Sequence, residues 1–199
     1  MVGDVFSGIY QRNEWNGVES RSGPGSGSMA TRRTAAAIRM LVRGLAIGSV
    51  VDVGCGDGYW MPDLPGYVGI DVAPEALSIA RGRHPGRAYV LDAGTASLPP
   101  ADLVIVRDVI QHLSLADGVA LLDRIRAAEP LWLLASTFAG TENRDVPTGG
   151  YAEPDLSTEP YALGPPVLLV PDGWDWVVGT QLRDPRKALG LWPMRADWP

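Results

Sequence analysis

The stretch SVVDVGCGDGYW, residues 49–60, decides the fold of this chain. Its first half is a short β-branched run, which predicts a buried strand over 49–53. Its second half places Gly54, Gly56 and Gly58 at alternate positions directly after that strand. Glycine adopts backbone angles that are closed to other residues and lets a ligand approach the main chain closely. A glycine turn at the carboxyl end of a strand is therefore the first candidate for a binding loop.

Outward from this stretch, strand-like and helix-like segments alternate along the chain. Such alternation predicts parallel strands joined by right-handed crossovers, with helices on both faces of a doubly wound α/β sheet. After Ala139 the alternation stops, and two short runs near the end predict a terminal antiparallel strand pair. The strands are expected at 49–53, 67–71, 88–92, 101–107, 131–139, 174–181 and 187–194, and the helices at 29–44, 75–83 and 115–129.

Length and composition fit one domain. The chain has 199 residues, and we expect a leader over 1–28 and a single domain over 29–199 with an insert at 140–175. Apolar residues make up 46%, but no run approaches the roughly 18 residues that a membrane span needs. The N-terminus lacks the features of a signal peptide, and a single cysteine allows no disulfide framework. We therefore expect a cytoplasmic protein without a membrane partner.

The charge is acidic and unevenly distributed. Basic residues number 17 against 23 acidic ones, a net charge of −6, and Lys187 is the sole lysine. Nucleic-acid surfaces need clustered Lys and Arg, so we expect no nucleic-acid partner. The insert at 140–175 carries seven carboxylates and one base and so accounts for the whole excess of negative charge.

The glycine loop lacks the signs of a phosphate site. A dinucleotide fingerprint would need glycine where Tyr59 stands, and no P-loop lysine follows. The next strand ends in Asp71, where a carboxylate can accept both hydroxyls of a ribose. The third strand ends in Asp92 and Ala93, placed to bind an exocyclic purine amine. Together these residues predict an adenosine without phosphate, for which S-adenosylmethionine (SAM) is the first candidate.

These motifs resemble those of class I SAM-dependent methyltransferases. VVDVGCGDG is similar to the first motif of that family, YVGIDVAPEAL to the acidic second and YVLDAG to the third, over residues 48–139. The resemblance implies a Rossmann-like methyltransferase fold, SAM as cofactor and S-adenosylhomocysteine as product. It implies that Gly54 and Gly56 approach the amino-acid part of SAM, that Asp71 binds the ribose and that Asp92 and Ala93 flank the adenine. The further candidate cofactor contacts in the core are Asp52, Cys55, Val72 and Arg107.

Single residues of this set also have simpler explanations. Isolated glycine turns often bind nothing, and Asp92 alone could cap a helix. Cys55 has no adjacent base, so we interpret it as a packing residue rather than a nucleophile.

The fourth strand ends in VIVRDVIQHLS, which places Asp108 and His112 at the expected ligand edge. Their spacing of four puts them on one face if this piece is helical. The carboxylate would then orient the imidazole, which would take a proton from the methyl acceptor. The alternative is that His112 forms only a hydrogen-bonded wall of the cofactor pocket. His84, the other histidine, lies in a polar loop and is interpreted as a surface residue.

The leader IYQRNEWNGVESRSGPGSGS resembles the opening of a subset of small bacterial methyltransferases, in which it folds over the SAM pocket. The resemblance makes candidate cofactor contacts of Tyr10, Trp15, Arg21, Ser22 and Gly23. Arg21 could pair with the methionine carboxylate. The alternative is a flexible tail with incidental aromatic residues.

The acidic insert suggests a cationic small-molecule acceptor, because a rim of carboxylates attracts cations. The candidate acceptor residues are Glu142, Asp145, Tyr151 and Glu153, with Trp60, Trp174 and Trp176 in reach of a sugar-like ligand. Together with the leader, this resembles aminoglycoside N-methyltransferases of the gentamicin type and implies an amino-sugar acceptor in antibiotic biosynthesis. The acids would hold amines that are not methylated, since only a free amine attacks the methyl group. The alternative is a solvated loop that keeps the protein in solution.

Two other functions stay open at this stage. The chain could methylate a protein or an RNA, or it could be a binding protein of the SAM fold without catalysis. No cluster of His, Asp and Glu shows metal-ligand spacing, so we expect no metal.

Overall fold

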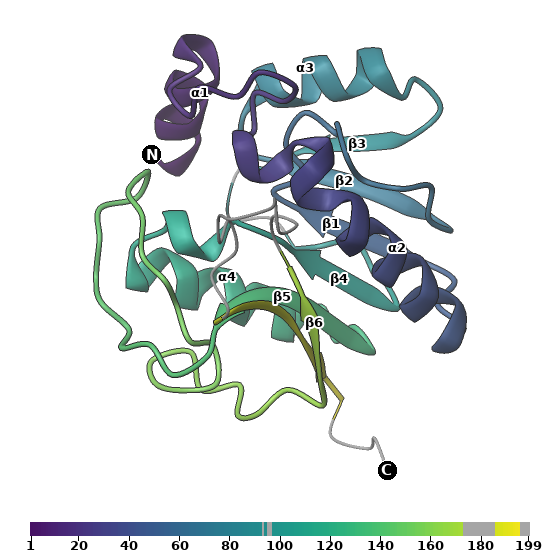
Figure 1. The fold of residues 1–199 in the computed structure, drawn as a ribbon, viewed down its shortest axis with the longest axis vertical. Helices are drawn as coiled ribbons and strands as arrows, with labels where there is room; N and C mark the ends of the chain where they lie inside the picture. The colour runs from purple at the N-terminus through teal and green to yellow at the C-terminus, as the bar shows by residue number, and fades with distance from the viewer. Residues whose placement is uncertain (93, 95–96, 173–185, 196–199) are drawn as a thin grey trace, which may run out of the picture.

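The computed structural model describes residues 1–92, 94, 97–172 and 186–195. Figure 1 shows one central sheet with helices on both of its faces. No helix within the described ranges is long and apolar enough to cross a membrane. The elements in chain order are α1 (Val2–Arg12), the 3-10 turn η1 (Pro24–Ser26), α2 (Ser28–Gly44), β1 (Val50–Val53), β2 (Tyr67–Asp71), α3 (Pro74–Arg83), β3 (Ala88–Leu91), β4 (Leu103–Val106), the 3-10 turn η2 (Ile110–His112), α4 (Leu115–Ala127), β5 (Trp132–Phe138), β6 (Leu168–Pro171) and β7 (Lys187–Pro193).

The seven strands form one sheet in the order β3-β2-β1-β4-β5-β7-β6. The first five of these run parallel, whereas β7 is antiparallel to both β5 and β6. Strand order reverses at β1, because β2 and β3 extend to one side and β4 and β5 to the other. In open α/β sheets, ligands bind beyond the carboxyl ends of the strands at such a point. The predicted doubly wound, Rossmann-like sheet with a terminal antiparallel pair is confirmed.

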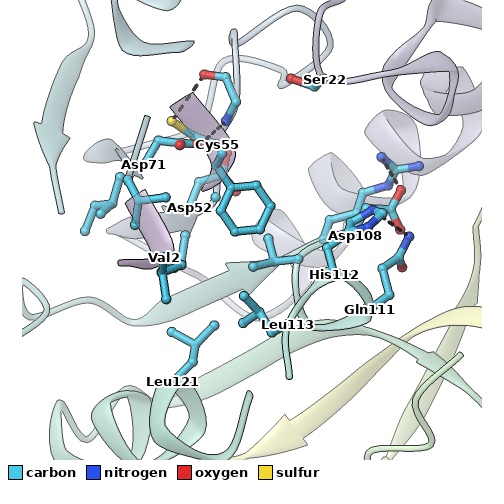
Figure 2. Close-up of a pocket in the computed structure, with 18 of the residues that line it drawn as sticks. Val2, Ser22, Asp52, Cys55, Asp71, Asp108, Gln111, His112, Leu113 and Leu121 are labelled. Carbon is cyan, nitrogen blue, oxygen red and sulfur yellow. Dashed lines mark hydrogen bonds and ion pairs between the residues drawn. The ribbon is translucent and has the colours of Figure 1, made fainter. Parts of the chain in front are cut away.

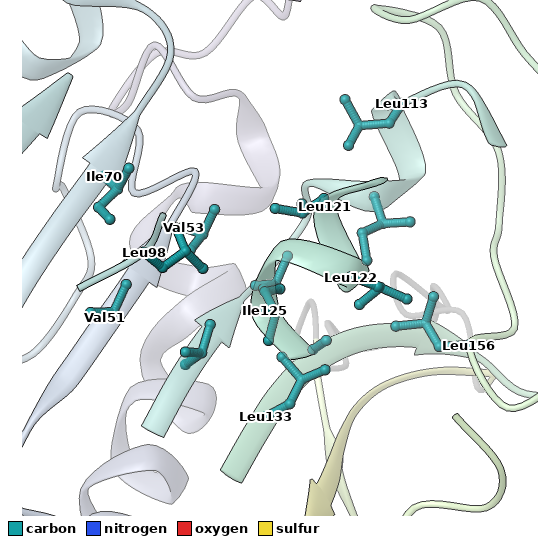
Figure 3. Close-up of a cluster of buried hydrophobic side chains, with 14 of the residues drawn as sticks. Val51, Val53, Ile70, Leu98, Leu113, Leu121, Leu122, Ile125, Leu133 and Leu156 are labelled. Atoms are coloured by element: carbon teal, nitrogen blue, oxygen red, sulfur yellow. The ribbon is translucent and has the colours of Figure 1, made fainter. Parts of the chain in front are cut away.

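The core lies on both faces of the sheet. Successive side chains of a strand point to opposite faces, so Val51 and Val53 of β1 pack in one buried cluster and Val50 in a second. Leu122 and Ile125 of α4, both fully buried, belong to the first cluster, which Figure 3 shows. Helix α2 supplies the second cluster. The central parallel strands β1, β4 and β5 are therefore covered on both sides, as their almost continuously apolar sequences require, whereas β3 at the edge is largely exposed.

Two hydrogen bonds fix the start of α4, one from within the same turn and one from the insert. The Ser114 side chain accepts a hydrogen bond from the backbone N–H of Asp117, which caps the helix. The backbone N–H of Leu115 donates to Asp145 at 2.8 Å, so the insert holds the same helix end. Because η2 ends only two residues before this cap, the cap also fixes the turn that carries His112.

Two elements differ from the sequence-based expectation. Part of the leader forms α1, in which Phe6, Ile9 and Tyr10 are buried against the sheet. The partner of β7 is β6, at 168–171, inside a proline-rich stretch in which no period is visible. The strand expected at 174–181 lies outside the described residues.

Candidate active site

A cavity of about 460 Å³ lies beyond the carboxyl ends of β1, β2 and β4. Its volume is within the range of pockets that enclose small ligands. Figure 2 shows two groups of polar side chains on opposite sides of it, and the apolar side chains of Val2, Leu113 and Leu121 also line it. The first group, Asp52, Cys55 and Asp71, surrounds the glycine loop; we call it the cofactor end. The second group, Asp108, Gln111 and His112, follows β4; we call it the acceptor end.

The glycine loop needs its glycines at two positions in particular. Gly54 and Gly56 have φ angles of 74° and 60°, a region that favours glycine. A Cβ atom at Gly54 would lie 2.3 Å from the Val109 side chain, and one at Gly56 would lie 2.2 Å from Ser22 Oγ. The loop is therefore packed between the turn after β4 and the leader, with no space for a side chain.

Asp71 at the end of β2 braces this loop. One carboxylate oxygen accepts a hydrogen bond from the Gly56 N–H and the other from the Ala73 N–H, each at 2.9 Å. Burial raises the pKa of Asp71 to about 6, although these backbone donors oppose the rise. A carboxylate has further lone pairs beyond the two in use, and Asp71 and Val72 both line the cavity. The group can therefore support the loop and still accept a bond from a ligand hydroxyl.

Burial also raises the pKa of two other groups of the cofactor end. Burial raises the pKa of Asp52 to about 7, and its carboxylate accepts a bond from the Tyr67 hydroxyl at 2.8 Å. Burial also raises the pKa of the Cys55 thiol far above its ordinary value, so the thiolate needed for a nucleophile does not form at neutral pH.

The far wall of the cofactor end is formed by Asp92. Its Oδ1 accepts hydrogen bonds from the Gly94 N–H at 2.8 Å and from Arg124 of α4 at 3.0 Å. Asp92 and Arg124 both line the cavity. Ala93, the other residue predicted to flank an adenine, lies outside the described residues.

The leader closes the cavity from above the glycine loop. Tyr10, Trp15, Ser22 and Gly23 all line it, and the Tyr10 and Ser22 hydroxyls hydrogen-bond to each other at 2.6 Å. Arg21 does not line it: its guanidinium donates to the Tyr10 carbonyl at 3.0 Å and its side chain is exposed. The position of Arg21 therefore does not support the predicted pairing with the methionine carboxylate of SAM.

The His112 ring is held at the acceptor end by aromatic neighbours. Its centroid lies 5.2 Å from that of Trp15 in the leader and 5.8 Å from that of Tyr151 in the insert. Nδ1 lies 2.8 Å from the Gly150 carbonyl, which can only accept, so Nδ1 carries the proton in the neutral ring. Nε2 is then the nitrogen with the free lone pair; Gln111 Nε2 lies 3.5 Å from it, at the long limit of a hydrogen bond.

Burial lowers the pKa of His112 below its ordinary value, although the bond to Gly150 and the charge of Asp108 oppose this. The ring is therefore neutral at pH 7, with Nε2 able to accept a proton. This is the state that a general base needs before the reaction.

Asp108 does not orient His112 as the spacing of the two residues suggested. Residue 108 precedes the 3-10 turn and has a φ of 58°, so the two side chains do not share a helical face. The carboxylate forms ion pairs with Arg107 at 3.2 Å and with Lys187 at 2.7 Å, while the Gly150 carbonyl takes the orienting position. Asp108 and Arg107 nevertheless line the cavity at the carboxyl end of β4, where the sequence placed them.

Comparisons with known proteins identify the central part of the chain. Residues 50–128 match a family model described as a methyltransferase domain. This segment, which is less than half of the chain, is therefore similar to a methyltransferase domain. A search of curated proteins finds no match.

Solved structures extend the likeness of this methyltransferase to the whole fold. Magnesium protoporphyrin IX methyltransferase from Synechocystis PCC 6803, with bound SAM, has a TM-score of 0.63 at 12% identity over 96% of each chain. A structure described under formation of a thioacetal group during echinomycin biosynthesis has 0.60 at 15%, over 97% of this chain and 91% of that one. An O-methyltransferase from neocarzinostatin biosynthesis, in complex with SAM and 2-hydroxy-5-methyl naphthoic acid, has 0.54 at 21%, over 74% and 49%. At these identities the likeness is one of fold.

The acidic insert of the methyltransferase contributes less to the cavity than its charge suggested. Tyr151 lines the cavity, whereas Glu142, Asp145 and Glu153 do not. Asp145 binds the start of α4, and Glu153 forms an ion pair with Arg186 at 2.7 Å. Trp60 lines the cavity, stacked on Arg107, while Trp174 and Trp176 lie outside the described residues.

Sequence reasoning missed Asp57, the residue that attaches the leader to the glycine loop. Its buried carboxylate accepts hydrogen bonds from Ser20 Oγ at 2.8 Å, from the Arg21 N–H at 3.0 Å and from the Tyr59 N–H at 3.2 Å. A carboxylate inside a glycine loop is a signal in the sequence, but its two partners in the leader, Ser20 and Arg21, lie more than 30 residues earlier. Phe6, Val109 and Gln111 were also missed as lining residues.

No group of three or more potential metal ligands is found among the residues that the structure describes.

Proposed function

We propose that this SAM-dependent methyltransferase transfers a methyl group to a hydroxyl or an amine of a small molecule bound at the acceptor end of the cavity. The observation that carries the proposal is the presence of a neutral His112 in the same cavity as the glycine loop and Asp71. One cavity thus combines residues suited to an adenosine with a proton acceptor.

The residues of the cofactor end fit SAM. Gly54 and Gly56 line the cavity and carry no side chain of their own, and Asp71 and Asp92 present carboxylates where a ribose and an adenine amine would need acceptors. The cavity offers no free lysine and no phosphate loop among the described residues, in agreement with a ligand that has no phosphate. When bound, SAM supplies an activated methyl group on a sulfonium, and its loss leaves S-adenosylhomocysteine.

The chain's own residues align the acceptor and remove its proton. Trp15 and Tyr151 fix the plane of the His112 ring, and the Gly150 carbonyl fixes its tautomer. Nε2 takes the proton that the acceptor oxygen or nitrogen loses as that atom forms its new bond to carbon, while the pair of the broken carbon–sulfur bond stays on sulfur. Alignment of this kind can contribute about 7–11 kcal/mol, and a base adds roughly 10²- to 10⁴-fold.

The amino-sugar form of the acceptor rests on the net charge of the insert. Its carboxylates would attract a cation to the protein, but Asp145 and Glu153 are engaged elsewhere and Tyr151 alone of the four candidate residues lines the cavity. We therefore propose a small acceptor with a nucleophilic oxygen or nitrogen, and an aminoglycoside as one class to test within it.

The test combines binding and product analysis. Calorimetry with S-adenosylhomocysteine should give one site per chain. Mass spectrometry of amino sugars, alcohols and phenols incubated with the enzyme and SAM should then show one acceptor class that gains a methyl group. The Glu153→Gln variant distinguishes the cationic form, because its KM for an amino sugar should rise if Glu153 recognises the amine and stay unchanged if it serves only Arg186.

Two outcomes would overturn the proposal. Absence of S-adenosylhomocysteine binding would remove the cofactor site. Binding together with methyl transfer only to protein or RNA, and to none of the small acceptors, would assign the enzyme to macromolecular substrates.

A further inference from the structure

Four charged side chains, two of them buried and two partly buried, meet at the acceptor end: Arg107, Asp108, Asp172 and Lys187, which we call the charge quartet. Arg107 lies 3.0 Å from Asp172 and 3.2 Å from Asp108. Lys187 lies 2.7 Å from Asp108 and 3.1 Å from Asp172. The side chains of Arg107 and Asp172 are at most 2% exposed, and those of Asp108 and Lys187 are 17% and 14% exposed. Two cations thus neutralise two carboxylates in an almost dry environment.

The charge quartet joins distant parts of the chain to the cavity wall. Arg107 and Asp108 follow β4 and line the cavity, Asp172 follows β6 and Lys187 begins β7. Arg107 also donates to the Gly25 carbonyl in the leader at 3.0 Å. The position of Lys187 beside Asp108 is therefore set by the pairing of β7 with β5, in which Lys187 lies opposite Phe138, rather than by the glycine loop.

Asp108 lines the cavity together with His112, and its charge acts on the imidazole. A carboxylate beside an imidazole favours the charged imidazolium, which cannot accept a proton. Lys187 contacts both oxygens of this carboxylate, at 2.7 and 2.9 Å, and so offsets its charge at short range. Ser136 Oγ accepts from the Asp108 N–H at 2.9 Å and holds the backbone at its unusual φ.

We propose that Lys187 is a positioning residue, which neutralises Asp108 so that the His112 imidazole beside it stays uncharged and available as a proton acceptor. The inference rests on the proposed function of His112. Lys187 itself need not touch the acceptor or SAM.

The groups that face His112 from each packed element agree with this assignment. The charged ones are Asp108 from the end of β4 and Lys187 from β7, whereas the leader and the insert supply the uncharged rings of Trp15 and Tyr151. Burial lowers the pKa of His112, Asp108 acts to raise it and Lys187 acts to lower it further. Burial alone would raise the pKa of Asp108, but Arg107 and Lys187 hold it well below its ordinary value, so the carboxylate is charged and needs a counter-ion.

The decisive experiment measures the pKa of His112 directly, without SAM or an acceptor. The chain has two histidines, so an NMR titration of the ring nitrogens in the full-length protein gives two curves, which the His112→Gln variant assigns. Lys187→Met leaves the quartet with a net negative charge and should raise the pKa of His112 by about 0.5–1 unit. Asp108→Asn gives it a net positive charge and should lower that pKa by a similar amount; asparagine also tolerates the positive φ.

Two further variants make the test specific. The double variant Lys187→Met/Asp108→Asn leaves a neutral pair of Arg107 and Asp172, and should return the pKa of His112 close to the wild-type value. Lys187→Arg keeps the positive charge, so the pKa of His112 should also stay close to the wild-type value. Arg195→Met, at the far end of β7 where Arg195 binds the Glu129 carbonyl, is the matched control and should move neither curve.

A merely structural quartet would behave differently. Loosening the cluster would admit water to His112 and raise its pKa in both single variants, because its burial would be relieved. A rise in Asp108→Asn, or no change in Lys187→Met, would therefore overturn the proposal. Absence of methyl transfer in the wild type would instead contradict the proposed function and leave these titrations interpretable.

Discussion

The two ends of the cavity are built in different ways. At the cofactor end, Gly54 and Gly56 follow β1 and Asp71 ends the adjacent parallel strand β2. The Gly56 N–H donates to the Asp71 carboxylate, and the Gly54 N–H donates to the Ile70 carbonyl of β2. At the acceptor end, His112 is placed by Trp15 from the leader and by the insert around Gly150. The residues of the cofactor end are thus positioned by strands of the sheet, whereas the acceptor end is positioned by the leader and the insert. This division allows the residues that contact the acceptor to change without disturbing the sheet or the cofactor end.

The strongest test of this division is His112→Gln. Glutamine can keep a hydrogen bond to the Gly150 carbonyl but cannot take up a proton, so kcat should fall by roughly 10²- to 10⁴-fold. The affinity for S-adenosylhomocysteine should stay within about twofold, since His112 belongs to the acceptor end. Steady-state kinetics and calorimetry on the same preparation check both. Equal losses in kcat and in cofactor affinity would show that the two ends are not separable.

The converse test changes the cofactor end alone. Gly56→Ala places a Cβ 2.2 Å from Ser22 Oγ and 2.8 Å from the Tyr10 hydroxyl at a φ of 60°. Strain of this kind costs about 1–3 kcal/mol, so the affinity for S-adenosylhomocysteine should fall by about 10- to 100-fold. Gly82→Ala is the matched control, because Gly82 lies in α3 and a Cβ there meets nothing within 4 Å. Similar affinities in both variants would refute the close packing of loop and leader.

The sequence predicted the cofactor end better than the acceptor end for a physical reason. Segments such as 49–53 and 67–71 are rich in β-branched and aliphatic residues, so each is recognisable as a strand from its own sequence. The residues that end these strands lie at the ligand edge of the sheet because of its topology. Lys187 meets Asp108 across 79 positions, and Asp57 meets Ser20 across 37, through single side-chain contacts that leave no periodic trace.

The same reasoning explains the secondary-structure differences. β6 has only four residues next to prolines and depends on β7 for its hydrogen bonds, so local propensity gave no signal. Helix α1 does carry an apolar face, Phe6, Ile9 and Tyr10. Its spacing was a signal in the sequence that the glycines around it obscured.

The buried acids of the cofactor end should give the protein an unusual pH response. The folded-state pKa of Asp52 is raised to about 7 from an ordinary 3.8, so the folded state keeps a proton that the unfolded chain releases above pH 4. Asp71, raised to about 6, acts in the same direction. The folded state binds more protons between these values, so the free energy of unfolding should fall as pH rises from 4 to 7.

Asp52→Asn isolates this effect. Asparagine still accepts the Tyr67 hydroxyl bond but does not titrate, so the variant should lose less stability than the wild type between pH 5 and pH 8. The difference should be on the order of 2 kcal/mol by linkage. Urea unfolding at the two pH values measures it. An identical pH dependence in both proteins would show that Asp52 is ionised in the fold at pH 5.

The smallest expected effect belongs to Asp57, which links the leader to the glycine loop and so joins the two ends. In Asp57→Asn one acceptor oxygen becomes an NH₂ group that faces the donors Ser20 Oγ and the Arg21 N–H. Loss of one charge-assisted hydrogen bond, about 1.5–3 kcal/mol at most, should reduce the affinity for S-adenosylhomocysteine by about tenfold.

The leader should at the same time open more often, so trypsin should cut after the exposed Arg21 faster than in the wild type. Asp63→Asn, whose carboxylate is 98% exposed, provides the matched acid control and should change neither affinity nor cleavage. Faster cleavage with unchanged affinity would show that the leader closes the acceptor end only. Lower affinity with unchanged cleavage would show that Asp57 acts on the loop and not through the leader. Both changes together would show that the leader contributes to the cofactor end as well as to the acceptor end. This is the expected result, because the leader packs against Gly56 at one end and His112 at the other.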